Sequence, residues 1–187
     1  MTPLATLWLP IVLSAVFLFF ASAIIHMVMP WHKSDFARLP DEEAFRRAVA
    51  PMQIPPGDYV APHCLTSADM KSPEYAAKLE EGPVLLMTVR PTGPIRMGPM
   101  FLSWMGFLLV ASTFVGWIAG AAVPPGAETR YVWHFTAAIA FVIYGLATWP
   151  AVIWYGRKAS SAFKDSVDGV IYAVITAVTF GWLWPVG

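Results

Sequence analysis

The chain has 187 residues, of which 57% are hydrophobic and only 13% are charged. A soluble domain usually carries about a quarter charged residues, so this composition indicates a protein whose main solvent is lipid. The formal net charge is zero, which gives no sign of a nucleic-acid partner, and the single cysteine, Cys64, excludes an internal disulfide.

A first hydrophobic run extends from Leu4 to Met29 and contains no Asp, Glu, Lys or Arg. About 20 apolar residues are enough to cross the hydrocarbon core of a bilayer, so we expect a membrane-spanning helix here. Ala21-Ser22-Ala23 has the small residues of a signal-peptidase site. However, no basic residue precedes the run, and the run continues beyond that site. We therefore expect it to be kept as a helix rather than cleaved.

A polar insert, Trp31 to Gly98, follows this helix and holds most of the charged residues. Asp41–Arg47 begins with acids and ends with bases, which favours a short helix. Ser72 is a good N-cap and Pro73 suits a first helical position, so a second helix is predicted to Glu81. Val84–Val89 predicts a strand, with Asp58–Val60 as its partner. The insert is therefore predicted to be a small ordered domain.

Three further apolar stretches are predicted to span the membrane: Met100–Val123, Tyr131–Tyr155 and Val167–Trp184. Pro124-Pro125-Gly126 leaves a short connection, so the second and third helices should form a hairpin. The predicted fold is an all-α membrane protein, a four-transmembrane-helix bundle with a small α+β polar insert between helices 1 and 2. Its domains are 1–30 for helix 1, 31–98 for the insert and 99–187 for helices 2–4.

Basic residues predict the orientation, because cytoplasmic segments near membrane spans carry an excess of Lys and Arg. The side opposite the insert holds only Arg130. We therefore expect a multi-pass protein of a bacterial inner membrane, with a cytoplasmic insert and both termini outside. The basic residues on the insert side are Lys33, Arg38, Arg46, Arg47, Lys71, Lys78, Arg90, Arg96, Arg157, Lys158 and Lys164.

Small residues recur at every fourth position in two of the predicted helices. Such positions share one face, and small side chains there let helix backbones approach closely in lipid. We expect these faces to close the bundle, and docking of a partner protein is the alternative. They comprise Ser112, Gly116 and Gly120 in helix 2, and Gly169, Ala173, Ala177 and Gly181 in helix 4.

Four side chains on the insert side are candidate metal ligands: His26, His32, His63 and Cys64. Zinc needs three or four such ligands, and structural zinc sites show closely paired spacing, which is missing here. We therefore expect no metal and no cofactor, with His26 capping a helix end and Cys64 buried as a small apolar side chain. A metal or enzyme site built on these residues is the alternative.

Asp168 is predicted to open helix 4, with Asp165 one turn earlier. A carboxylate at a helix N-terminus is stabilised by the helix dipole and by free N–H groups, so we expect an N-cap. Ionisable groups at membrane depth are otherwise functional candidates, and a proton or ion role is the alternative.

No Ser-centred nucleophile elbow, Gly-rich phosphate loop or HExxH motif is present. We therefore expect an interaction or accessory subunit rather than an enzyme. Its partners would be the lipid bilayer and either another membrane protein or a second copy of the chain. The alternatives are a membrane-embedded enzyme or metal-binding protein that uses the insert, and a small oligomeric transporter or channel.

The sequence resembles a family of uncharacterised bacterial four-helix inner-membrane proteins. None of the segments that carry the resemblance is a catalytic signature. The resemblance therefore implies a bacterial inner membrane and no particular activity. The segments are Thr2-Pro3-Leu4, Ile24-Ile25-His26, Pro56-Gly57-Asp58-Tyr59, Pro62-His63-Cys64, Glu81-Gly82-Pro83, Met97-Gly98, Asp168-Gly169 and Phe180-Gly181-Trp182-Leu183-Trp184-Pro185.

Overall fold

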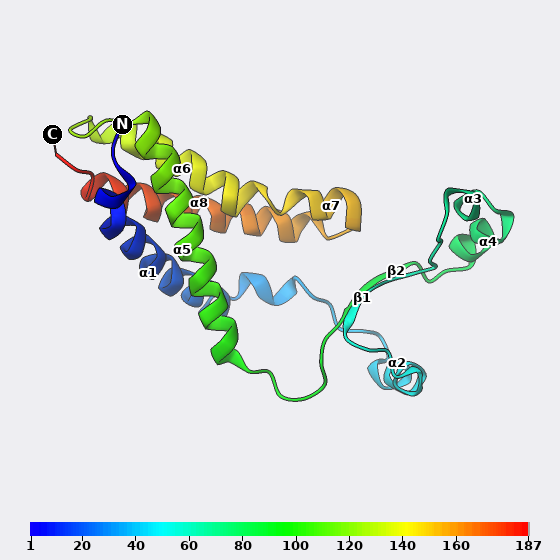
Figure 1. The fold of residues 1–187 in the computed structure, drawn as a ribbon. Helices are drawn as coiled ribbons and strands as arrows, with labels where there is room; N and C mark the ends of the chain where they lie inside the picture. The colour runs from blue at the N-terminus through cyan, green and yellow to red at the C-terminus, as the bar shows by residue number, and fades with distance from the viewer. Residues whose placement is uncertain (187) are drawn as a thin grey trace. The chain divides into compact units, whose positions relative to one another are not determined.

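A computed structural model describes residues 1–186 and divides the chain into two compact units (Figure 1). The first unit comprises Met1–Ala37 together with the chain from Arg96 onwards, and its elements are all helical. The second unit is Arg38–Ile95 and contains the only sheet among the described residues. Trp31–Ala37, which the sequence placed in the insert, thus belongs to the helical unit.

The first membrane helix is continuous from Leu4 to Val28. A 3-10 turn leads into α1, Trp8–Ala23, and a π-helical turn, Ile24–Val28, ends it. Met29 is extended (φ −75°, ψ 142°), as expected for a residue that precedes proline. The predicted helix is confirmed, and its end is fixed by Pro30.

Two further long helices form the predicted hairpin. The first, α5, spans Met97–Ala122 and ends at an extended Val123, which precedes Pro124. The second, α6, spans Thr129–Phe141 and continues through a π-helical turn, Val142–Leu146, towards α7. The short helix α7, Trp149–Tyr155, ends where Gly156 adopts a left-handed conformation (φ 64°).

Among the described residues, three helical stretches are long and apolar enough to cross a membrane: Leu4–Val28, Met97–Ala122 and Thr129–Tyr155. They indicate a membrane protein. The fourth predicted span, Val167–Trp184, overlaps α8, Ala159–Trp182, which does not meet the same criteria. Its N-terminal half carries charged residues, so a count of four crossings stays a prediction.

The predicted start of the last helix was wrong. α8 begins at Ala159, with Lys158 at the N-cap, so Asp168 lies inside the helix and is not its cap. Polar residues such as Lys164 made this stretch resemble a loop in the sequence. They belong to the helix, and Lys164 contacts Trp31, Ser34 and Asp35 of the first unit.

Small residues of α8 lie against α6 and the π-helical turn. A Cβ atom added to Gly169 would lie 2.4 Å from the Cα of Gly145, and one added to Gly181 would overlap the Trp133 indole. Ala173 and Ala177 are buried between these glycines. In the described residues, this face of α8 therefore packs against α6 and the π-helical turn.

The small residues of α5 face the N-terminal segment. A Cβ added to Gly120 would lie 2.7 Å from the Thr2 carbonyl oxygen, one added to Gly116 would press on Ile11, and Ser112 is buried. Thr2 also donates its backbone N–H to the Gly120 carbonyl (2.7 Å). This face therefore closes on the chain's own N-terminus.

The second unit confirms the predicted local elements. α2, Glu42–Val49, is capped by Asp41, and α4, Pro73–Glu81, by Ser72, while a short α3 spans Ser67–Met70. The strands β1, Gly57–Ala61, and β2, Leu85–Val89, pair antiparallel. No residue from Arg38 to Ile95, all of which the structure describes, is buried.

Candidate functional site: a histidine–carboxylate cluster

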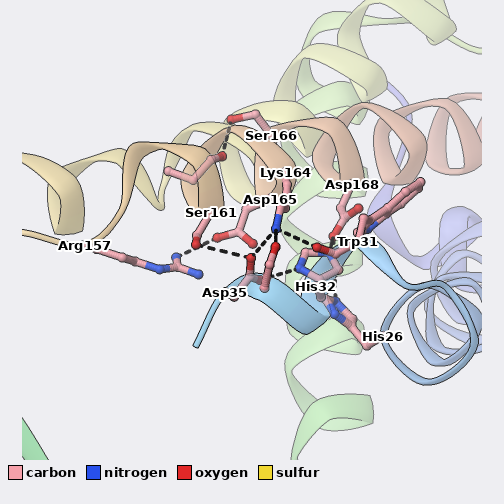
Figure 2. A network of polar contacts seen from close by, with 12 residues as sticks. His26, Trp31, His32, Asp35, Arg157, Ser161, Lys164, Asp165, Ser166 and Asp168 are labelled. Carbon is pink, nitrogen blue, oxygen red and sulfur yellow. Dashed lines mark hydrogen bonds and ion pairs between the residues drawn. The ribbon is translucent and has the colours of Figure 1, made fainter. Parts of the chain in front are cut away.

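A short 3-10 turn, Trp31–Ser34, follows the first membrane helix and lies against the N-terminal half of α8 (Figure 2). The Lys164 ammonium holds it there. Its Nζ donates to the Trp31 carbonyl oxygen (2.6 Å), the Ser34 hydroxyl (2.8 Å) and the Asp35 carboxylate (2.7 Å). One cation thus satisfies three acceptors and fixes the position of the neighbouring His32.

His32 lies between two carboxylates. Its Nδ1 is 2.7 Å from Asp35 Oδ2, and its Nε2 is 2.8 Å from Asp168 Oδ2. Ionised carboxylates only accept hydrogen bonds, whereas a neutral imidazole has one donor nitrogen and one acceptor nitrogen. Both contacts are satisfied if His32 is protonated, if Asp168 itself carries a proton that it donates to Nε2, or if another cation replaces one of the imidazole protons.

The charged neighbours shift two pKa values at this point. Burial by itself lowers the pKa of His32, but its hydrogen bonds to Asp35 and Asp168 outweigh that effect and raise it above the ordinary value. Burial raises the pKa of Asp35, and hydrogen bonds from Lys164 and His32 reverse this and hold it at about 2. Asp35 is therefore ionised at any physiological pH.

His26 approaches the same carboxylate from the end of α1. Its Nε2 is 3.8 Å from Asp168 Oδ2, and its ring centroid is 4.5 Å from that of His32. The expected capping role of His26 was wrong, because the backbone N–H of Met29 closes the π-helical turn on Ile24. The His26 imidazole instead faces Asp168.

Asp168 is the buried centre of the cluster, with 3% of the residue exposed. Its Oδ1 is buried and has no hydrogen-bond partner. The ion pairs found for Asp168 within the described residues are to the two histidines. A buried carboxylate with an unpaired oxygen is costly, so this position favours either a proton or a further cation.

Two sets of side chains in the described part of the chain place their ligand atoms within 4.8 Å of one another. One set is His26, His32 and Asp168, and the other shares His32 and adds Asp35 and Asp165. In the second set, both carboxylates already pair with cations, Asp35 with Lys164 and Asp165 with Arg157. The first set is therefore the better metal site.

The structure brings together four of the six polar residues that the sequence singled out: His26, His32, Asp165 and Asp168. His63 and Cys64 belong to the second unit, where they line a pocket of about 220 Å³ with Asp69 and Tyr75. Cys64 is half-buried rather than buried.

The sequence analysis did not single out Asp35. It used Lys164 only as one of the basic residues that predict the orientation of the chain in the membrane. The available signal was the spacing of His32 and Asp35, three residues apart, which lets both side chains meet across one turn. Their contact with α8 could not be read from the sequence, because it joins positions more than a hundred residues apart.

The chain was also compared with family models, with curated proteins and with solved structures. None of the three comparisons gave a match. What this site does is therefore argued from its own geometry and chemistry.

Proposed function

We propose that this protein binds a transition-metal ion through His26, His32 and Asp168, where the first membrane helix meets α8. One observation carries the proposal: Oδ2 of the buried Asp168 carboxylate lies within 4 Å of the Nε2 atoms of both His26 and His32. Two His and one carboxylate form a donor set that suits iron or zinc. The sequence had favoured no metal, because it could not show that Asp168 meets the histidines.

The spacing of the donor atoms is compatible with one ion. Metal–ligand bonds of about 2.0–2.2 Å place neighbouring ligand atoms roughly 3–3.5 Å apart. The His32 Nε2–Asp168 distance of 2.8 Å and the His26 Nε2–Asp168 distance of 3.8 Å bracket that range. Small side-chain rotations are enough to bring both contacts into it.

Asp35, which lies on the other side of the His32 ring, also supports the proposed metal site. A metal-bound His usually donates its second ring N–H to a carboxylate, which fixes the ring and strengthens the ligand. His32 already has Asp35 in that place, 2.7 Å from Nδ1. Lys164 in turn fixes Asp35, so the first ligand is held before any ion arrives.

The three-residue site leaves coordination positions for water or substrate. This pattern is typical of catalytic metal sites, whereas structural zinc sites use four protein ligands. The membrane-embedded enzyme or metal-binding protein, which was the alternative reading of the sequence, is thus the function that the geometry supports best. Its ligands include Asp168 in place of His63 and Cys64.

Metal content of untagged protein tests the proposal. We expect about one zinc or iron ion per chain, lost in Asp168→Asn and in His26→Ala. His63→Ala and Cys64→Ala are the matched controls, because they remove candidate ligands from the second unit, and both should keep the metal. Protein that takes up no metal after loading and dialysis, or that keeps it in Asp168→Asn, would overturn the proposal.

We further propose that the protein crosses a bacterial inner membrane four times, with α8 as the fourth crossing. The excess of Lys and Arg in the insert and around Arg157–Lys164 supports a cytoplasmic location for both segments. The proposed metal site then lies near the cytoplasmic surface, and both termini lie outside. The bacterial origin rests on the sequence resemblance alone.

An interaction or accessory role is the second candidate, and the second unit favours it. This unit has no buried residue and leaves apolar side chains exposed, including Leu65, Leu86 and Ile95. Leu86→Asp should abolish a stoichiometric complex seen after gentle detergent extraction, while His26→Ala should leave it intact. If the Leu86→Asp variant still forms the complex, Leu86 does not lie in the interface.

A further inference from the structure

The cluster borders an apolar pocket of about 440 Å³ between the end of α1 and the start of α5. His26 lines one part of the pocket and is also a ligand of the proposed metal site. The remaining lining residues are Phe19, Ser22, Ala23, Met27, Met97, Met100, Phe101 and Trp104. The volume is within the usual range for sites that bind small molecules.

The pocket wall is mostly apolar, and His26 is the only ionisable side chain among the described residues that line it. Its other polar side chains bind each other, because the Trp104 indole N–H donates to the Ser22 hydroxyl (2.8 Å), which lies 2.9 Å from the Phe19 carbonyl oxygen. Three methionines line the rest, and their flexible side chains adapt to ligands of varied shape. A ligand therefore finds apolar surface along the pocket and a polar contact at His26.

The position of the pocket would let a ligand enter it from the bilayer. Both α1 and α5 belong to helices that can span a membrane. Met27, at the rim of the pocket, is 66% exposed, and Met100 is 45% exposed. A hydrocarbon chain can therefore enter sideways from lipid without passing through water.

We infer that this pocket holds the hydrocarbon tail of a membrane-soluble amphiphile and brings its polar end to the metal. The inference rests on the metal site proposed above and names its substrate class, a lipid-like molecule with a polar head that can ligate the ion. The head group reaches the metal beside His26, whose side chain is 48% exposed.

A second groove provides an internal control. It lies between α6 and α8, has a volume of about 620 Å³ and is lined by apolar residues such as Ala138. It borders neither of the two candidate ligand sets. Ala138→Phe places a phenylalanine in this groove and serves as the control. Ala23→Phe makes the same substitution in the pocket beside His26.

The test uses cobalt-loaded protein in lipid nanodiscs and two hydroxamic acids with the same metal-binding head. Acetohydroxamic acid has almost no tail, and dodecanohydroxamic acid has a long alkyl tail. Binding is followed by the change in the cobalt absorption bands. We expect Ala23→Phe to weaken binding of the long probe at least tenfold and to leave the short probe unchanged. Ala138→Phe should match the wild type with both probes.

Equal binding of the long probe to wild-type and Ala23→Phe protein would overturn the inference while leaving the metal site standing. Absence of cobalt bands in the wild type would overturn the proposed function, and the inference with it. If Ala23→Phe fails to load cobalt, Met27→Phe closes the same pocket at its exposed rim and decides the question by the same comparison.

Discussion

At the scale of single residues, two different cations can satisfy the acceptors around His32. One is its own second proton, which makes an imidazolium that donates to both carboxylates. The other is a metal ion, which replaces the proton on Nε2 and leaves Nδ1–H on Asp35. Proton and metal therefore compete for the same atom.

This competition predicts how pH acts. The pKa of His32 is raised in the folded protein. Protonated His32 thus stabilises the metal-free protein fully below its unfolded pKa of about 6.5, and this contribution is lost as pH rises through the folded pKa. We expect metal-free protein to melt at lower temperature above that pKa, and zinc affinity to increase over the same interval. A His32→Gln variant should lose the pH dependence of melting in this range. Flat profiles in the wild type would contradict the prediction.

Asp35 is predicted to matter for stability before any metal binds. Asp35→Asn removes the charge that pairs with Lys164 and with protonated His32. We expect the unfolding temperature in detergent to fall by a few degrees. The control is Glu74→Gln, which removes an ion pair of similar length (2.6 Å to Lys78, against 2.7 Å for Asp35–Lys164) at an exposed site, where such pairs contribute little. A larger loss for Glu74→Gln than for Asp35→Asn would contradict this account.

At the scale of elements, the sequence predicted the helices whose limits depend on local chemistry. Pro30 and Pro124 end two membrane helices, and Asp41 and Ser72 cap two short ones. The start of α8 was missed because its N-terminal half is polar. Its Lys164 contacts Trp31 and Asp35, a tertiary contact that local sequence does not encode.

The close approach of α8 to the π-helical turn gives a prediction with a matched control. Gly169→Ala places a methyl group against the Gly145 backbone, which cannot move aside easily. We expect a loss of about 1–3 kcal/mol, as is typical of overpacking. Gly106 lies in α5 with nothing within 4 Å of an added Cβ, so Gly106→Ala should be neutral or stabilising by up to about 1 kcal/mol. Thermal unfolding in one detergent compares the two, and equal effects would mean that the contact at Gly169 is loose.

At the scale of the whole molecule, the composition was enough to indicate a membrane protein, and three apolar helices agree with it. The candidate site was less predictable. His26, His32, Asp165 and Asp168 were each singled out, but their meeting depends on a tertiary contact between the two ends of the chain. Single-sequence reasoning therefore identified the residues and assigned them separate roles.

Labelling of residues near the two ends of α8 tests whether this helix crosses the membrane. Ser160, near the start of α8, and Val186, four residues after its end, are both exposed. In a Cys64→Ala background, we expect Val186→Cys to react with a membrane-impermeant maleimide on intact cells. Ser160→Cys should react only after the cells are permeabilised, because Arg157, Lys158 and Lys164 favour the cytoplasmic side for this segment. If both positions react from outside, α8 lies along one surface and the chain crosses the membrane three times. If only Ser160→Cys reacts, α8 does cross, but the orientation is inverted and the metal site faces outward.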